Sequence, residues 1–124
     1  MKNPPLSVLI IDDNLLFADR LSHLLAEINI QSIDIANNYF EALQKLETFI
    51  PDIIFIDINL PGRDGIELIK KIKQYNFSYN IIVLTSQADN HTKSIYKEIG
   101  IFSFVDKSND LDNLPEIINR IHKD

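Results

Sequence analysis

Three acidic residues directly follow two strongly apolar runs in this sequence of 124 residues. Asp12 and Asp13 come after the run 8–11 (VLII), and Asp57 comes after the run 53–56 (IIFI). Short apolar runs bounded by polar residues are typical of parallel strands that are buried on both faces. The carboxyl ends of such strands open into a common crevice, where ligands bind. If the two strands are neighbours, the three carboxylates meet in that crevice.

Three carboxylates at one place repel one another, so the pattern predicts a bound cation. Two carboxylates about 5 Å apart repel by roughly 3 kcal/mol at an effective dielectric constant near 20. Mg²⁺ suits such a site because it prefers oxygen ligands and keeps several waters, which phosphate oxygens can replace. Phosphoryl chemistry would then make one carboxylate the nucleophile, since aspartyl phosphates are covalent intermediates.

A hydroxyl and an ammonium group follow two further apolar runs. Thr85 comes after the run 81–84, and Lys107 comes shortly after the run 101–105. Lys107 would neutralise charge on a phosphoryl group, and Thr85 could donate a hydrogen bond to one of its oxygens. Taken singly, these residues have ordinary alternatives: the acidic pair could cap a helix, Asp57 could close a strand, and the other two could be a strand-end hydroxyl and a solvated charge. Their combination favours a site.

Strands alternating with helices must position these residues, and the sequence predicts that alternation five times. The expected strands span about 7–11, 32–36, 52–57, 80–84 and 101–105, and the expected helices about 14–28, 38–50, 65–75, 89–99 and 112–122. Right-handed crossovers make all five strands parallel, with helices on both faces. We therefore expect one α/β domain over residues 1–124, a doubly wound, flavodoxin-like (βα)5 sheet of order 2-1-3-4-5. In this order the first and third strands are neighbours.

Local signals define several of the helix boundaries. Asn14 is a good N-cap residue for the first helix, the second helix is expected to begin at about Asn38, and Pro51 stops it. Helical spacing predicts that the second helix buries Phe40, Leu43, Leu46 and Ile50. The fourth helix is mostly polar and offers few apolar residues for packing, so we expect it to be weakly held.

Composition excludes several other classes of function. Cysteine is absent, which excludes disulfides, thiolate zinc sites and thiol catalysis. The net charge is −6, whereas proteins bind phosphate backbones through clustered Lys and Arg. We therefore do not expect this chain to bind nucleic acid directly. No run approaches membrane-spanning length, and the first residues lack the apolar stretch of a signal peptide. We expect a soluble, cytoplasmic protein without membrane contact.

Five positions combine into one pattern: Asp12-Asp13, Asp57, the loop 60–65 (LPGRDG), Thr85-Ser86 and Lys107. This pattern resembles the receiver domain of two-component response regulators, over essentially the whole chain. The length is similar to that of single-domain chemotaxis regulators. Two positions depart from the family's usual residues: Ser108 stands where proline is common, and Phe104 stands where tyrosine is commoner.

The resemblance implies a role for each residue of the acidic crevice. Asp57 would accept a phosphoryl group from a phosphohistidine on a sensor histidine kinase or a histidine phosphotransfer protein. Mg²⁺ would be bound by Asp12, Asp13, Asp57 and the backbone carbonyl of Asn59. Lys107 would contact the phosphoryl oxygens and Asp57. The chain would thus catalyse only its own phosphorylation and dephosphorylation, as a switch and not as an enzyme acting on other substrates.

The resemblance also implies how the signal would leave the site. Thr85 would move toward the phosphoryl group, and Phe104 would enter the space that Thr85 vacates. The surface of the fourth helix, fifth strand and fifth helix would then change for a downstream protein target. A monomer and a phosphorylation-dependent dimer are both compatible with this reading.

Three other functions give weaker matches to the residues. A pseudo-receiver that binds a partner without phosphorylation would be expected to lack an acidic, threonine or lysine position, and none is missing. A phosphatase of the haloacid dehalogenase type would need a second aspartate two residues after Asp57, where this chain has Asn59. A flavodoxin-like cofactor carrier needs a glycine- and hydroxyl-rich phosphate loop after the first strand, whereas Asp12 and Asp13 would repel a bare phosphate.

Overall fold

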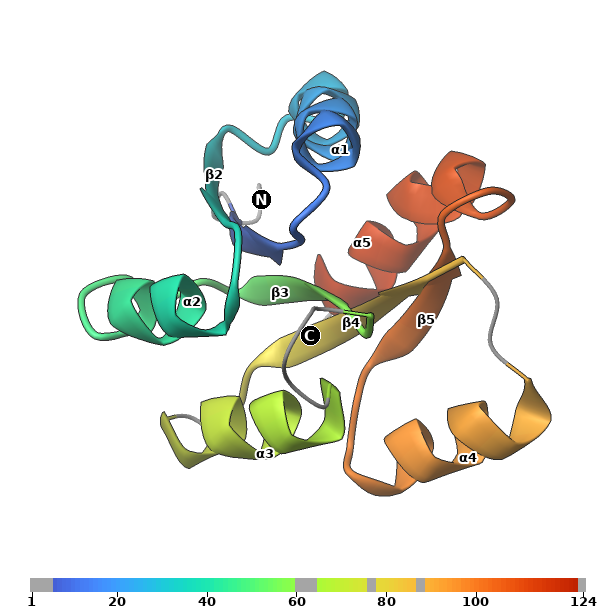
Figure 1. The fold of residues 1–124 in the computed structure, drawn as a ribbon. Coiled ribbons are helices and arrows are strands. Elements are labelled where there is room, and N and C mark those ends of the chain that lie inside the picture. The colour runs from blue at the N-terminus through green and yellow to red at the C-terminus, as the bar shows by residue number, and fades with distance from the viewer. Residues whose placement is uncertain (1–5, 60–64, 76–77, 87–88, 123–124) are drawn as a thin grey trace.

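The computed structural model of the chain describes residues 6–59, 65–75, 78–86 and 89–122. The strands are β1 Ser7–Ile11, β2 Ser32–Ala36, β3 Ile53–Asp57, β4 Asn80–Thr85 and β5 Ser103–Asp106. The helices are α1 Leu15–Glu27, α2 Tyr39–Leu46, α3 Gly65–Tyr75, α4 Asn90–Glu98 and α5 Leu114–His122, the last preceded by a 3₁₀ turn, Leu111–Asn113. Strands and helices alternate along the whole chain (Figure 1).

The five strands form one parallel sheet of order β2-β1-β3-β4-β5, which confirms the predicted fold class. Ile11, the last residue of β1, pairs with Ile56, so Asp12 follows β1 at the level where Asp57 ends β3. Thr85 pairs with Asp106 at the same end of the sheet. The order and the register together therefore bring the polar strand ends to one edge.

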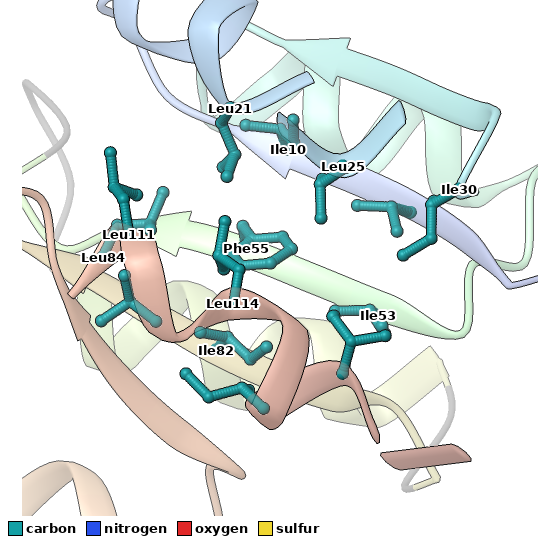
Figure 2. Packing of buried hydrophobic residues seen from close by; sticks show 14 of the residues in the cluster. Ile10, Leu21, Leu25, Ile30, Ile53, Phe55, Ile82, Leu84, Leu111 and Leu114 are labelled. Carbon is teal, nitrogen blue, oxygen red and sulfur yellow. The ribbon is translucent and has the colours of Figure 1, made fainter. Parts of the chain in front are cut away.

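Two apolar layers hold the sheet between helices. On one face, α1 and α5 cover alternate residues of the strands; Figure 2 shows Phe55 of β3 among Ile10, Leu21, Leu84 and Leu114. On the other face, α2, α3 and α4 pack against the intervening strand residues (Figure 1). Because both faces are covered, the central strands are apolar without alternation, as expected for a parallel sheet.

The second helix differs from its prediction in both length and phase. Asn38 is its N-cap, and the Asn38 side chain accepts a hydrogen bond from the Glu41 N–H. The helix ends at Leu46, where bonds to the residue three positions back tighten the chain. The predicted inner residues Phe40 and Ile50 are 67% and 73% exposed, so that part of the prediction was wrong.

The physical reason is the phase that the cap imposes on α2. With the helix starting at Tyr39, residues 42, 43 and 46 face the sheet, and Ala42 takes the inner position predicted for Phe40. Ile50 lies beyond the end of the helix. Elsewhere the boundary shifts are smaller: β5 begins at Ser103 and not at 101, and α5 begins at Leu114, after the 3₁₀ turn.

Hydropathy of the helices bears on membrane association. Among the residues that the structure describes, none of the helices combines the length and the apolar character that crossing a bilayer requires.

Candidate functional site

The acidic cluster forms at the carboxyl ends of β1 and β3, as the sequence predicts. Asp12, Asp13 and Asp57 each offer one carboxylate oxygen, and these oxygens all lie within 4.8 Å of one another. Asp12 and Asp57 are buried, whereas Asp13 is exposed at the opening. The Asp12 N–H donates to the carbonyl of Ala36 in β2, which extends the sheet to the cluster. The acids are therefore fixed by the strands that carry them.

Lys107 lies between the two buried carboxylates. Its Nζ is 2.8 Å from Asp12 Oδ2, an ion pair, and donates a hydrogen bond to Asp57 Oδ2 at 3.2 Å. Its backbone N–H donates to the carbonyl of Thr85 at 2.8 Å, which ties the lysine to the end of β4. The ammonium also lies 4.5 Å from the centroid of the Phe17 ring. The structure thus brings together the lysine and acids that were predicted to share a site.

Burial and ion pairing shift the pKa values of Asp12 and Lys107 in opposite directions. Burial raises the pKa of Asp12, and the contacts with Lys107 and with the Asn14 N–H oppose that rise only in part. Burial by itself would lower the pKa of Lys107, but the contact with Asp12 and the charges of Asp57 and Asp12 raise it above the usual value. Lys107 is therefore charged at neutral pH, and one ammonium is shared by two buried acids.

The loop after β5 holds Lys107 in place although Ser108 replaces the proline that is common in receivers. The Ser108 N–H, which a proline would lack, donates to Asp106 Oδ1 at 2.7 Å. The Asn109 N–H donates to the same oxygen at 3.3 Å, and the Asp106 N–H donates to Asp110 Oδ2 at 3.0 Å. These side-chain bonds fix the turn that carries the lysine.

Thr85 and Phe104 lie on the same face of neighbouring strands. Val83 pairs with Phe104, and side chains alternate along a strand, so Thr85 is diagonal to Phe104 on that face. Thr85 is buried, and within the described part of the chain its Oγ1 has no hydrogen-bond partner. Phe104 is half-buried, and its ring meets that of Tyr96 of α4 edge to face, with the centroids 6.1 Å apart.

The segment after Asp57 is described only at its two ends. The Asn59 N–H donates to Asp57 Oδ1 at 2.9 Å, so the chain turns back over the carboxylate. Residues 60–64 of the predicted loop lie outside the described residues, and Gly65 begins α3. A Cβ on Gly65 would lie 2.5 Å from the hydroxyl of Tyr96, so a side chain at this position would require Tyr96 to move.

The donor set of the cluster fits a divalent, oxygen-preferring cation. Three carboxylates and the Lys107 ammonium leave two negative charges, which Mg²⁺ would balance. Asp12 Oδ2 is buried and, among the described residues, meets Lys107 without hydrogen-bond geometry, so it can accept a metal ion. The exposed Asp13 leaves the cluster open to solvent and to a phosphate oxygen.

Two contributors were not singled out in the sequence. The sequence pattern predicts that Phe17 is an ordinary core residue of the first helix. It does not distinguish Asp106 from the other acidic residues near the end of the chain. Their only sequence signal is position: Phe17 lies in the first turn of the helix that follows Asp12 and Asp13, and Asp106 directly precedes Lys107. Their contacts depend on side-chain directions that the periodicity does not encode.

Comparison with known proteins agrees with the geometry. The family model of the response regulator receiver domain matches residues 8–119. A protein-glutamate methylesterase/protein-glutamine glutaminase of Desulfotalea psychrophila is 35% identical over 108 residues, which cover 85% of this chain and 29% of that protein. The sensory transduction protein LytR of Staphylococcus haemolyticus is 32% identical over 117 residues, which cover 94% of this chain and 45% of LytR. The chain thus spans less than half the length of these two relatives.

A solved structure agrees with the fold along nearly the whole chain. The signal receiver domain of a DNA-binding response regulator from Colwellia psychrerythraea superposes with a TM-score of 0.87 at 27% identity, covering 96% of this chain and 99% of that one. The match to the family model includes the strand ends that carry the acids, the threonine and the lysine. The chain belongs to the response regulator receiver domain family, the regulatory domain of two-component signalling systems.

Proposed function

We propose that Asp57 is the phosphoryl acceptor of this receiver domain and that Mg²⁺ at the acidic cluster assists the transfer. The observation that carries the proposal is the contact of Lys107 with both Asp12 and Asp57 in a cluster of three carboxylates. Asp12, Asp13, Asp57 and the backbone carbonyl of Asn59 would hold the ion. When bound, the ion would supply positive charge for the transferring phosphoryl oxygens.

The residues of the chain would share the remaining tasks. Asp57 Oδ attacks phosphorus, and the bond from phosphorus to the donor's leaving atom breaks as the new P–O bond forms. Lys107 stays protonated, because its pKa is raised, and stabilises the charge that develops on the phosphoryl oxygens. The buried Thr85 hydroxyl, without a hydrogen-bond partner among the described residues, would donate to one of these oxygens.

The same arrangement supports a switch. An aspartyl phosphate adds negative charge and acceptor oxygens beside Thr85, and movement of Thr85 would open space on the face that it shares with Phe104. Phe104 contacts Tyr96, so its movement would reach α4 directly. We propose the surface of α4, β5 and α5 as the region that a downstream protein reads.

The phosphoryl donor would be a histidine kinase or a histidine phosphotransfer protein. Such a donor must bring its phosphohistidine to Asp57, so its surface must contact the residues around the opening. Leu15 and Leu16 begin α1 just after Asp13 and are 56% and 86% exposed. Exposed leucines beside a reactive group are suited to bind an apolar partner surface.

Phosphorylation from acetyl phosphate tests the proposal without a protein donor. With Mg²⁺ and acetyl phosphate, intact-mass spectrometry should show one acid- and base-labile phosphoryl group on the wild type. The matched Asp57→Asn variant keeps the size of the side chain and should gain none. An unlabelled wild type would contradict the proposal and would favour a pseudo-receiver that binds its partner without phosphorylation.

A further inference from the structure

The ring of Phe17 is one of the groups that contact the Lys107 ammonium. The Lys107 Nζ is 4.5 Å from the ring centroid, within the range in which an aromatic face attracts a cation. The same ammonium contacts Asp12 and Asp57. The ammonium therefore interacts with two carboxylates and with the face of one aromatic ring.

The backbone of α1 fixes the ring relative to the acids. The Phe17 N–H donates to the side chain of its N-cap, Asn14, at 3.1 Å. The Asn14 N–H in turn donates to Asp12 Oδ1 at 2.9 Å. Two hydrogen bonds therefore connect the backbone of Phe17, through Asn14, to the buried carboxylate of Asp12, and the Lys107 ammonium contacts both that carboxylate and the Phe17 ring. A shift of Phe17 would therefore change the two contacts that the ammonium makes with the ring and with the Asp12 carboxylate.

Packing alone is an alternative explanation of this residue. Phe17 is half-buried and packs against the core that α1 and α5 cover, which any apolar side chain of similar size would do. The position of the ammonium over the ring indicates a role beyond packing. Desolvation disfavours a buried charge, and the negative face of the ring offsets part of that cost. Lys107 is only 15% exposed, so the ring replaces water on that side of the ammonium.

We propose that Phe17 is a positioning residue, which holds the Lys107 ammonium at Asp12 and Asp57 through the face of its ring. Phe17 does not contact the reacting atoms and acts through the lysine. The inference deepens the proposed function and rests on it. Its consequence is that the rate of phosphorylation depends on the aromatic character of residue 17 as well as on its size.

Three variants distinguish the effect of the aromatic ring at position 17 from the effect of side-chain size. Phe17→Leu keeps an apolar side chain that packs in the core but removes the aromatic face, and it should phosphorylate about fivefold more slowly with acetyl phosphate and saturating Mg²⁺. Phe17→Tyr and Phe17→Trp keep an aromatic face and should remain within about twofold of the wild-type rate. Urea unfolding of each variant, measured alongside, reports any loss of packing.

A spectroscopic measurement tests the contact between Lys107 and the Phe17 ring directly, independently of any rate. In ¹³C-lysine-labelled protein, the Hε resonances of Lys107 should be shifted upfield by the ring current, and the Lys107→Arg variant assigns them. Lys45, which is paired with Asp34 at 3.1 Å, is the reference lysine in the same sample. The shift should persist in Phe17→Tyr and disappear in Phe17→Leu.

The outcomes distinguish the inference from the proposed function. A wild type that acetyl phosphate does not label contradicts the proposed function. If the wild type is labelled but Phe17→Leu is labelled equally fast, or if Lys107 shows no ring-current shift, the positioning role is wrong and the proposed function stands. If Phe17→Leu does not fold, the lysine resonances of the wild type and of Phe17→Tyr still decide.

Discussion

In β1 and β3, all eight apolar residues that precede the acids are fully buried, whereas α4 buries one of its nine residues, Tyr96. The central strands lie in the middle of the sheet with helices on both faces, and α4 lies at one side of the molecule beside β5 (Figure 1). Local stability follows the density of buried apolar contacts. We propose that the two regions have different tasks: the firmly packed strands would hold the phosphoryl acceptor, and the weakly packed helix would respond to phosphorylation.

The largest expected effect is on stability, and it is measured by substituting a phenylalanine with alanine in each of the two regions. Phe55→Ala, in β3, should lower the free energy of unfolding by about 3–5 kcal/mol, because the ring is fully buried and leaves a cavity. Phe104→Ala, beside α4, should cost roughly half as much, since its ring is half-buried. Urea denaturation of both variants measures the difference. Equal losses would contradict the contrast between the regions.

The next effect concerns the loop that connects β5 to the site. Asp106→Ala removes the acceptor of the Ser108 and Asn109 N–H groups, so Lys107 should be held less firmly and phosphorylation by acetyl phosphate should slow about tenfold. Asp106→Asn keeps the Oδ1 acceptor and is the matched control. Should both variants react as fast as the wild type, the side chain of Asp106 does not position the lysine.

A smaller effect, on stability, tests the electrostatics of the rigid region. Burial raises the pKa of Asp12, so in metal-free buffer the folded protein should lose stability as pH rises from the unfolded value of 3.8 through the folded pKa, and lose no more above it. Asp12→Asn cannot ionise and should be more stable than the wild type at pH 7, by about 1 kcal/mol, because burial penalises the charged carboxylate and the charge of Asp57 adds to that penalty. Denaturation curves between pH 4 and pH 8 measure the gap, which should close at low pH. If the difference in stability between Asp12→Asn and the wild type widens at low pH, the pKa of Asp12 is lowered and not raised in the folded protein, and this explanation is wrong.

The smallest effect is local and concerns α4. Asp89 caps this helix by accepting a hydrogen bond from the Thr92 N–H at 2.8 Å, which lowers the pKa of Asp89. Asp89→Ala should speed hydrogen exchange of the amides in the first turn of α4 and leave those of β1 and β3 unchanged. Asp89→Asn, which can also cap, is the control. Faster exchange throughout the sheet would show that α4 and the core open together.

The sequence predicted the sheet, because apolar runs without alternation have few readings other than buried parallel strands. It also predicted the meeting of Asp12, Asp13 and Asp57, since strand order and register determine where strand ends lie. The burial of Phe40 was predicted wrongly, because the phase of a short helix depends on its cap as much as on its apolar residues. The loop after Asp57 could not be compared, since residues 60–64 lie outside the described residues.

The supports of Lys107 show a second limit of sequence patterns. Phe17 and Asp106 contact the lysine or its loop through the directions of their side chains, which neither spacing nor residue type determines. Helical periodicity places Phe17 correctly toward the core, but several neighbouring residues share that assignment. The place of Thr85, by contrast, was predicted from the sequence, because the residue directly follows an apolar run, and the structure puts it at the end of β4, at the edge of the sheet where β1 and β3 also end.

Hydrogen exchange measured by mass spectrometry, with and without phosphorylation, tests the central claim most directly. In the wild type with Mg²⁺ and acetyl phosphate, the peptide that contains Asp57 should carry the phosphoryl group, the amides of α4 should gain protection, and those of β1 and β3 should not change. The Asp57→Asn variant should show no change at α4 under the same conditions. Equal, high protection of α4 in both states of the wild type, or the same change in Asp57→Asn, would contradict a rigid acceptor that acts on a weakly packed helix.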